Sequence, residues 1–531
     1  MSELRSGEGG RGSGEDRSGA GGRESGKATP ETAAAGLAHR LDSETLISYV
    51  QGRRWFGAKG GAPTAARIAH ALQLPWAGGV FAILRLDIDT TAGTLQYQLP
   101  VAARAAAPAG ATTIAQVGDH AVYDATEDPE FRRELAAAFA GGCTVEYDGG
   151  RWVVARAGDR RLTLPPGADV TLGSAEQSNT SMRLGTSAIL KLFRKLEAGE
   201  HPDVEVTEFL TLRQGFPNTP VLLGTIRWED ASGTTVGGML QELVAGATGA
   251  WEYTLTTGRA YFDASRDSTP ENAFEADAAQ LGRVTRTMHD ALARDDSSPS
   301  FAPEAAEEEE LQDWAQRAEQ QIEAAIDLLE RQLAAGRIRR DRVEEAKVVV
   351  RRREHYIDLI EEIVEHVDED AGQCIRHHGD YHLGQVLRTA AGEFMIIDFE
   401  GEPARPLAER RRKHSPLRDV AGMLRSFSYA AATLAGDARN GSGGTDPGTV
   451  EVRTGRWERD ARDAFLAGYF GNAAAGYLPQ EPANARRLLA LFEIEKVFYE
   501  LAYELNNRPE WIGIPLRGIA RLTTGEMSRE R

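Results

Sequence analysis

Cysteine is scarce in this sequence, and long apolar runs are missing. Only Cys143 and Cys374 occur among 531 residues, far apart and without a C-x-x-C pair, so neither a disulfide framework nor a zinc site is supported. No stretch of about twenty apolar residues occurs, which predicts no membrane-spanning helix. The amino terminus lacks the apolar core of a signal peptide. We therefore expect a cytoplasmic chain that works in a reducing setting and not at a membrane.

Basic residues are also in deficit. The chain has 61 Lys and Arg against 80 Asp and Glu, which gives a formal net charge of −19. This balance argues against a general nucleic-acid binder, because such proteins present a basic surface to the phosphate backbone. It does not exclude ATP, since only one local pocket has to be positive.

Local composition divides the chain into four parts. Residues 1–40 are rich in Gly, Ser and charged residues and predict a disordered tail, because they bury too little apolar surface to offset the entropy of ordering. Residues 41–165 alternate short apolar runs with turns, which indicates a β-rich unit with a helix near 128–140. Residues 166–245 add strands and one helix, and residues 246–531 are mostly helical. An α+β fold is expected.

The run from His378 to Gln385, followed by Ile396-Ile397-Asp398-Phe399-Glu400, has the spacing of a kinase catalytic centre. In protein kinases a catalytic Asp is followed five positions later by an Asn that binds Mg²⁺, and a second Asp comes later in Asp-Phe-Gly. Here Gln385 follows Asp380 by five positions, and Asp398 stands in the second place. One amide oxygen and one carboxylate suit Mg²⁺, which takes few ligands from protein. The competing interpretation is a glycine turn that carries His and Asp by chance.

A kinase also needs a cation for the nucleotide phosphates, and Lys191 is the candidate. It lies in the apolar run Ala188–Phe193, which is strand-like by composition. Glu205 or Glu208, on a segment that Pro202 marks as the first turn of a helix, could pair with it. Alternatively, Lys191 extends its ammonium group from an edge strand to water, and Glu205 complements the helix dipole.

Two further segments stand where a kinase would contact the nucleotide. Ser178-Asn179-Thr180-Ser181 precedes Lys191 as a phosphate-covering loop would, although no G-x-G-x-x-G or Walker A pattern lies near it. Gln241 and Leu243 are placed like the hinge whose backbone hydrogen-bonds adenine. A polar hairpin turn and a plain strand end are the alternative interpretations.

Taken together, these motifs resemble those of bacterial maltokinases, which are similar to aminoglycoside phosphotransferases and share the eukaryotic-like kinase fold. The resemblance extends from about residue 41 to about residue 525. Two departures are the N-terminal tail and His201, which stands where Asn is expected before Pro-Asp. The segments that carry the resemblance are Arg54–Gly60, Ser178–Ser181, Lys191–Arg194, Pro202–Val206, His378–Gln385, Asp398–Pro403, Pro416–Ser426 and Tyr503–Leu516.

The resemblance implies a bilobal kinase fold with an N-terminal cap subdomain over 41–165, a kinase N-lobe over 166–245 and a helical C-lobe over 246–531. It also implies the reaction: ATP and maltose give ADP and maltose 1-phosphate, which feeds α-glucan synthesis, with Mg²⁺ as cofactor. In these roles Asp380 accepts or orients the proton of the anomeric hydroxyl. Gln385 and Asp398 hold Mg²⁺, with Glu400 contributing through a second ion or water.

The sugar is expected on the helix that contains Lys496, Tyr499 and Tyr503, whose spacing of three and four residues places them on one helix face. Tyrosine offers a disaccharide both a flat apolar wall and a hydroxyl. His378 and Arg508 complete the expected sugar contacts. The alternative is that the tyrosines belong to the core and that Lys496 extends to solvent.

Three rival functions remain open from the sequence. One is a kinase for another sugar, especially glucosamine, and another is an aminoglycoside phosphotransferase. The third is a pseudokinase that binds other glucan enzymes, against which the intact set of Lys191, Asp380, Gln385 and Asp398 argues. A monomer or a weak oligomer is expected.

Overall fold

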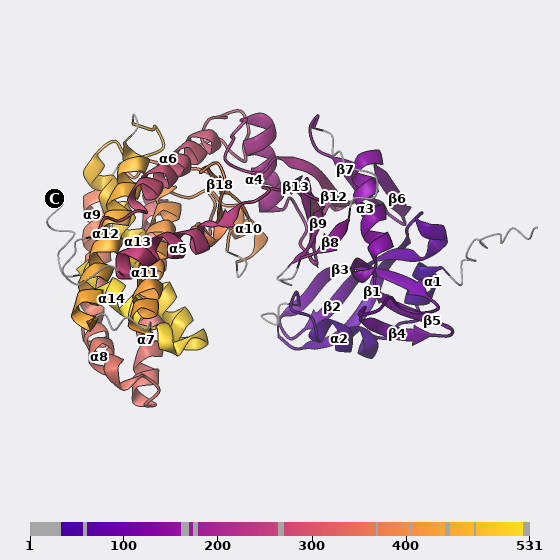
Figure 1. The fold of residues 1–531 in the computed structure, drawn as a ribbon, viewed down its shortest axis with the longest axis horizontal. Helices are drawn as coiled ribbons and strands as arrows, with labels where there is room; N and C mark the ends of the chain where they lie inside the picture. Colours follow the sequence, from indigo (N-terminus) through magenta and orange to yellow (C-terminus); the bar gives the residue numbers. More distant parts are fainter. Residues whose placement is uncertain are drawn as a thin grey trace, which may run out of the picture.

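The computed structural model separates a strand-rich N-terminal half from a helical C-terminal half, which lie side by side in Figure 1. The structure describes residues 33–56, 61–160, 169–173, 179–263, 270–367, 370–402, 405–440, 446–471 and 474–523. No helix in those ranges is both long and apolar enough to span a bilayer. The prediction of a mixed fold with a helical C-terminal region is confirmed.

The first sheet forms the N-terminal unit, and its strands lie in the antiparallel order β1-β2-β3-β5-β4. Nearly all of β2 is buried, because helices and sheet strands cover both of its faces. Asp42 starts α2 by accepting a hydrogen bond from the Thr45 amide at 2.8 Å, an N-cap. The elements are α1 (Ala34–Ala38), α2 (Ser43–Gln51), β1 (Pro63–Gln73), β2 (Phe81–Thr90), β3 (Gly93–Arg104), β4 (Thr113–Val117) and β5 (His120–Asp124).

The second sheet carries the segment around Lys191, and its order is β6-β7-β12-β13-β10-β9-β8. The short strand β11 (Lys195–Leu196) pairs with β3 and so ties the two sheets together. Helix α3 (Pro129–Gly141) packs on β7 and β8. The strands are β6 (Cys143–Tyr147), β7 (Gly150–Arg156), β8 (Val170–Leu172), β9 (Asn179–Leu184), β10 (Ala188–Phe193), β12 (Leu222–Asp230) and β13 (Gly233–Glu242), and helix α4 (Pro202–Glu208) follows β11.

The helical half surrounds α13, a helix that is buried along most of its length. Four acidic side chains of α13 are buried or nearly so, and each pairs with an arginine: Glu493 with Arg462, Glu495 with Arg418, Glu500 with Arg425 and Glu504 with Arg508. Pairing removes the cost of burying a lone charge. The helices are α5 (Ala250–Asp263), α6 (Glu275–Leu292), α7 (Glu308–Ala334), α8 (Val343–Arg351), α9 (Arg353–Val367), α10 (Leu407–Arg410), α11 (Leu417–Asn440), α12 (Pro447–Phe470), α13 (Pro482–Asn507) and α14 (Gly513–Thr523).

Two small sheets interrupt the helices. One consists of β14 (Thr248–Gly249), β17 (Val386–Arg388) and β18 (Phe394–Ile396), and the other of β15 (Glu304–Ala305) and β16 (Gln373–Cys374). The three-residue helical turn Leu383–Gln385 precedes β17, so β17 and β18 form a hairpin between Gln385 and Asp398. This hairpin sets the distance along the chain between the two expected metal ligands.

Two predicted boundaries differ from the structure. Among the described residues, regular structure begins at α1, whose Leu37 packs in the core of the first sheet, whereas the tail was expected to extend to residue 40. Residues 1–32 of that tail lie outside the described residues. The expected cap unit was to end at 165, but β6 and β7 belong to the second sheet; after β5, only the short β11 adds to the first sheet among the described residues. Strand pairing depends on partners distant in sequence, here β12, which local composition does not reveal.

Candidate active site

The predicted catalytic loop, His378–Gln385, is fixed by a carboxylate from the first turn of α11. Asp419 accepts hydrogen bonds from the amides of His378 (2.7 Å) and Gly379 (2.9 Å), and its Oδ2 lies 3.2 Å from His289 Nε2. Burial alone would raise the pKa of Asp419, but His289 and the other histidines hold it well below its usual range. Gly379 has φ of 82°, a conformation that favours glycine. The loop is therefore rigid immediately before Asp380.

Lys191 binds two carboxylates at once. Its Nζ lies 2.7 Å from Asp203 Oδ2 and 2.8 Å from Asp398 Oδ1. Burial alone would lower the pKa of Lys191, but the negative charges of Asp203, Asp398 and Glu400 raise it above its ordinary value. The same carboxyl group of Asp203 accepts the Phe399 amide through Oδ1 at 2.9 Å, which joins α4 to the loop of Asp398.

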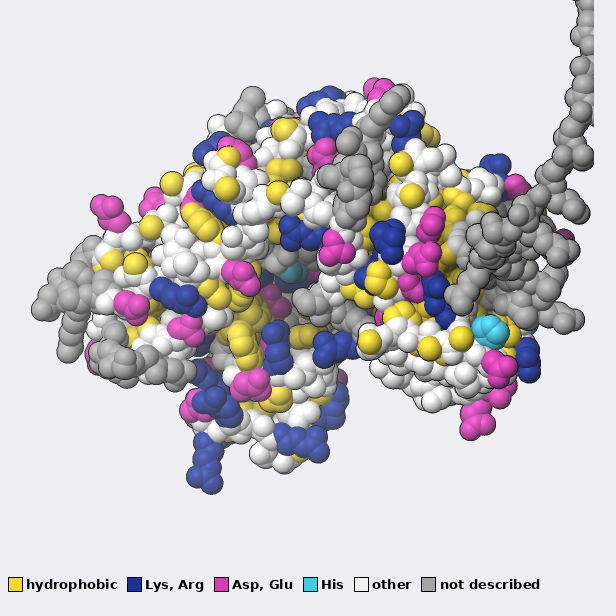
Figure 2. Space-filling model, turned by 45° about the vertical axis from the view of Figure 1, so that its right-hand side comes forward, with side chains coloured by type: hydrophobic (Ala, Val, Ile, Leu, Met, Phe, Trp, Pro, Cys, Tyr) yellow, Lys and Arg dark blue, Asp and Glu magenta, His cyan; other side chains and the backbone are white. Residues whose placement is uncertain are grey.

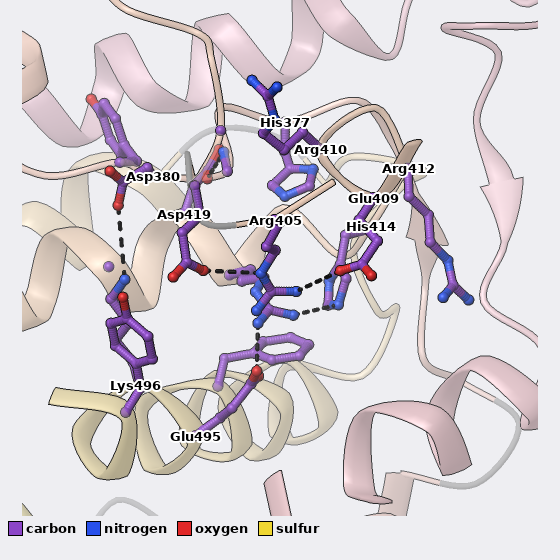
Figure 3. Close-up of a pocket in the computed structure, with 18 of the residues that line it drawn as sticks. His377, Asp380, Arg405, Glu409, Arg410, Arg412, His414, Asp419, Glu495 and Lys496 are labelled. Carbon is purple, nitrogen blue, oxygen red and sulfur yellow. Dashed lines mark hydrogen bonds and ion pairs between the residues drawn. The ribbon is translucent and has the colours of Figure 1, made fainter. Parts of the chain in front are cut away.

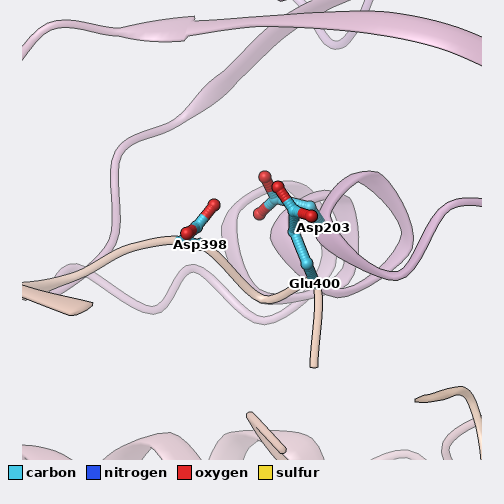
Figure 4. Close-up of side chains that lie close together, drawn as sticks. All are labelled: Asp203, Asp398 and Glu400. Atoms are coloured by element: carbon cyan, nitrogen blue, oxygen red, sulfur yellow. The ribbon is translucent and has the colours of Figure 1, made fainter. Parts of the chain in front are cut away.

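Asp203, Asp398 and Glu400 form a carboxylate cluster in which one oxygen from each lies within 4.8 Å of the others (Figure 4). Asp398 has φ of 71°, a strained conformation for a residue with a side chain, and such strain concentrates at functional sites. Burial would raise its pKa, but Lys191 lowers it to about 2. Burial and the neighbouring Asp398 raise the pKa of Glu400 to about 8. Three crowded oxygen donors of this kind suit a hard divalent cation such as Mg²⁺.

Three of the predicted nucleotide contacts from the phosphate segment can be located. Asn179 donates from Nδ2 to Glu400 Oε1 at 2.8 Å, so it lies at the carboxylate cluster. Thr180 is buried, and its hydroxyl accepts a hydrogen bond from Arg194 Nε at 2.8 Å. We expected this side chain to contact phosphate, but its hydroxyl is occupied by Arg194. Ser181 pairs with Lys191 across β9 and β10. Ser178 lies outside the described residues.

The expected pairing of Glu205 with Lys191 is wrong for this structure. Glu205 Oε2 instead lies 3.0 Å from Arg376 Nη2, and Oε1 lies 2.8 Å from Arg411 Nη2. Glu205 therefore connects α4 to the segments on either side of the catalytic centre. Sequence reasoning missed Asp203, although it stands directly after Pro202 in a motif that carried the resemblance.

The two predicted hinge residues and the predicted metal ligand Gln385 are only partly where they were expected. The Leu243 amide donates to the Ser187 carbonyl at 3.0 Å, so it is not free to bind adenine. Gln241 is buried within β13 and pairs with Ile189 of β10. Gln385 accepts the Ile397 amide through its backbone carbonyl at 3.0 Å, which places it beside the loop of Asp398.

Asp380 lies in a pocket between the predicted catalytic loop and α13, where it faces Lys496 (Figure 3). Tyr499 also lines this pocket. Lys496 Nζ is 3.9 Å from Asp380 Oδ1 and 5.1 Å from the centre of the Tyr499 ring. The Tyr499 hydroxyl hydrogen-bonds Glu402, which helps Arg405 to hold the pKa of Glu402 below its ordinary value against the effect of burial. Figure 2 shows the surface hollowed between the two halves of the molecule.

The remaining predicted sugar residues separate into two groups. His378 is 1% exposed, and its Nε2 lies 3.0 Å from the Ile397 carbonyl, so its side chain braces the loop; its contact with the sugar stays a prediction. Tyr503 is 43% exposed and its ring lies 6.4 Å from that of Tyr499. The Arg508 guanidinium lies 5.4 Å from the Tyr503 ring, beyond the pocket residues. Neither Tyr503 nor Arg508 lines the pocket at Asp380.

Several known proteins are similar to this chain. Residues 49–128 match the family model described as the maltokinase N-terminal cap domain. A glucosamine kinase of Mycolicibacterium smegmatis is 28% identical over 352 residues, which cover 64% of this chain and 76% of that protein. A glucosamine kinase of Streptacidiphilus jiangxiensis is 25% identical over 343 residues, covering 64% of this chain and 70% of that protein. The predicted resemblance to maltokinases and their aminoglycoside phosphotransferase-like relatives is confirmed.

A solved structure, glucosamine kinase in complex with glucosamine, ADP and inorganic phosphate, superposes with a TM-score of 0.64 at 18% sequence identity. The superposition covers 92% of this chain and 99% of the other. A second structure of glucosamine kinase, crystal form A, gives a TM-score of 0.63 at 19% identity. These likenesses show that the chain shares the fold of a kinase.

Proposed function

We propose that this chain is a sugar kinase that transfers the γ-phosphoryl group of ATP to the anomeric hydroxyl of maltose. The observation that carries the proposal is the position of Asp380, which lies both on the predicted catalytic loop and in the pocket proposed for the sugar. It stands on the loop that Asp419 fixes, and it lines the pocket of Lys496 and Tyr499. The relatives named glucosamine kinase and the match to a maltokinase cap support a sugar as the acceptor.

In the proposed reaction Asp380 accepts the proton of the sugar hydroxyl while the oxygen of that hydroxyl forms a bond to the γ-phosphorus. The bond between the γ-phosphorus and the bridging oxygen breaks, and ADP leaves with the electron pair. Lys191, held by Asp203, binds phosphate oxygens of the nucleotide. Asp203, Asp398 and Glu400, with Gln385 nearby, would hold Mg²⁺, which neutralises phosphate charge when bound. Most of the rate enhancement comes from positioning and charge stabilisation.

The charges of the pocket favour a neutral sugar. Its carboxylates, other than Asp380, face cations or backbone amides: Glu402 and Glu409 face Arg405, Glu495 pairs with Arg418, and Asp419 holds the loop. The charged group of α13 that lies nearest to Asp380 is the cation of Lys496. The ammonium group of an amino sugar would be repelled by Lys496 and would find no unpaired carboxylate among the residues that line the pocket.

Glucosamine is the second candidate, because both curated relatives and the superposed structures carry that name. In either case the setting we propose is the cytoplasm, with a monomer or weak oligomer as the active form. Maltose 1-phosphate would be a precursor for α-glucan synthesis.

The test is consumption of Mg-ATP by the purified protein against maltose, glucose, glucosamine, trehalose and an aminoglycoside, with each product identified by NMR. Turnover confined to maltose, with phosphate on C1, is the expected result. Turnover with glucosamine would keep the mechanism and replace the substrate. If no acceptor is phosphorylated although Mg-ATP binds, the kinase proposal is overturned in favour of a partner-binding role.

A further inference from the structure

A second cavity lies in the helical half, and it shares no lining residue with the pocket at Asp380. Its walls are one face each of α11, α12 and α14, which lie together in the left part of Figure 1. Small side chains on these faces leave the space between the helices open. The lining comprises Arg425, Ser428, Ala432, Ala435, Arg439, Glu451, Thr454, Gly455, Glu458, Arg459, Ile514, Arg517, Gly518 and Arg521.

The cavity is strongly cationic in a chain that is acidic overall. Five of its lining residues are arginines, and only Glu451 and Glu458 are acidic. The excess is local, because the whole chain has a net charge of −19. The cavity therefore gathers guanidinium groups at one concave place on an acidic protein.

Two of the five arginines are neutralised by the protein itself. Arg425 Nη2 lies 2.7 Å from Glu500 Oε2 of α13, and Arg521 pairs with Glu458. Glu458 is also bonded by the Ser428 hydroxyl, and although burial would raise its pKa, Arg521 and Arg462 lower it to about 2. Glu458 is therefore a fixed negative charge that its own neighbours already satisfy.

The other three arginines have no such partners. Within the part of the chain that the structure describes, Arg439, Arg459 and Arg517 make no ion pair and no side-chain hydrogen bond. Partial desolvation, followed by the positive charge of Arg342, lowers the pKa of Arg517 against the opposing negative charges of Glu458 and Glu345, and Arg439 also lowers it. Three helices thus bring three exposed arginines to one cavity, where an anion from solution can reach them. Glu451, the lining carboxylate that no ion pair among the described residues neutralises, opposes an anion, but the three arginines outnumber it.

We propose that this cavity binds the phosphate group of a small phosphorylated metabolite through Arg439, Arg459 and Arg517. Guanidinium groups form forked, charge-assisted hydrogen bonds that match the oxygens of phosphate. A dianion gains from all three cations at once, whereas a neutral sugar gains from none of them. Inorganic phosphate and a sugar phosphate offer the same group, so both are possible sources. The proposal does not depend on the proposed function, because the cavity is separate from the pocket at Asp380.

The test is isothermal titration of the full-length protein with inorganic phosphate and, separately, with glucose 1-phosphate, at constant ionic strength. Arg459→Gln and Arg517→Gln are each expected to weaken binding at least tenfold. Arg456→Gln is the matched control, since Arg456 lies on the same helix α12, does not line the cavity and pairs with Asp460. The control is expected to bind like the wild type, which separates a specific site from a general charge effect.

Thermal unfolding gives a second readout that guards against misfolded variants. Without phosphate, Arg517→Gln should unfold at a higher temperature than the wild type, because one of the repelling charges is gone. With phosphate, the wild type should gain stability and the variant should gain less. Stronger binding of glucose 1-phosphate than of inorganic phosphate identifies the sugar phosphate as the source. The proposal is overturned if the wild type shows no saturable binding, or if both cavity variants bind phosphate as the wild type does.

Discussion

At the scale of single residues, the site depends on charges that hold one another in place. Lys191 has two carboxylate partners where one was expected, and Asp398 is shared between that lysine and the carboxylate cluster. A lysine held this way points its ammonium group at a fixed place before the nucleotide arrives. Positions of this kind are sensitive to the exact length of a side chain, so neighbouring acids such as Asp203 and Glu205 are not interchangeable.

Asp380→Asn should reduce kcat at least about 100-fold, the usual contribution of a general base. The stability of the variant should differ little from that of the wild type. The ion pairs of Asp380 with His382 and Lys496 are long, at 3.8 and 3.9 Å, and partly exposed. Steady-state kinetics and thermal unfolding measure the two quantities. Asp358→Asn, at an exposed position of α9, is the control. An Asp380 variant that keeps most of its turnover would remove this residue from its assigned role.

The pair Asp203→Asn and Glu205→Gln separates the two acids of α4. Asp203→Asn should raise KM for ATP about tenfold, because Lys191 loses one of its two carboxylate partners. Glu205→Gln should leave that KM nearly unchanged but lower the free energy of unfolding by roughly 3 kcal/mol, since Arg376 is buried and loses its partner. Kinetics with ATP and urea unfolding provide the measurements. The opposite pattern would restore Glu205 as the partner of Lys191.

At the scale of elements, the nucleotide segment is tied to the N-terminal unit. Arg194, at the end of β10, is 2% exposed and donates to Thr180 of β9, to Asp124 of β5 and to Thr126. One side chain therefore joins the first sheet to the strand that begins with Asn179. Through these hydrogen bonds the N-terminal unit, which matches the maltokinase cap model, is connected directly to the strand beside Lys191.

Arg194→Gln should destabilise the protein by roughly 3 kcal/mol, because Asp124 is buried and would lose its cation. It should also raise KM for ATP, since β9 loses its anchor to the first sheet. Arg183→Gln, on the exposed side of β9, is the matched control and should change neither quantity. Denaturant unfolding and ATP kinetics check both effects. Full stability in the Arg194 variant would contradict this account.

Elements with a strong local period were the ones that the sequence predicted well. The helix expected near 128–140 is α3, and the helix expected around Lys496 is part of α13. The strand expected around Lys191 is β10. The sequence placed the segment of β6 and β7 in the cap subdomain, but these strands pair in the second sheet, and their composition is β-like in either sheet. Only the pairing of β7 with β12 decides to which sheet they belong.

At the scale of the whole molecule, buried histidines couple stability to pH. His414 stacks on Trp314 of α7, with ring centres 4.9 Å apart, and its Nε2 lies 2.8 Å from Arg418 Nη1. The guanidinium can only donate, so this nitrogen must accept and the ring must be neutral. Burial and the Arg418 charge hold the pKa of His414 well below its ordinary value of 6.5.

Lowering the pH below about 6.5 should therefore reduce stability, by up to about 1.4 kcal/mol per pH unit from this residue. The unfolded chain takes up a proton there and the folded chain does not, so the stability is complete above pH 6.5 and is lost as the pH falls. Urea unfolding at pH 7.5 and 5.5 measures the decline. His414→Gln keeps a polar side chain but cannot titrate, so its decline should be smaller. An equal decline in both proteins would assign the effect to other groups.

Spacing along the chain was enough to predict the residues of the proposed reaction centre. Lys191, Asp380 and Asp398 are recognisable because their spacing along the chain reflects short local structures, a strand and a loop-hairpin unit. Which side chains meet across those units depends on how the units pack in three dimensions. It paired Asp203 with Lys191, buried His378 behind the loop and gathered unpaired arginines from α11, α12 and α14. Contacts of this kind join residues far apart in sequence, and packing alone fixes them.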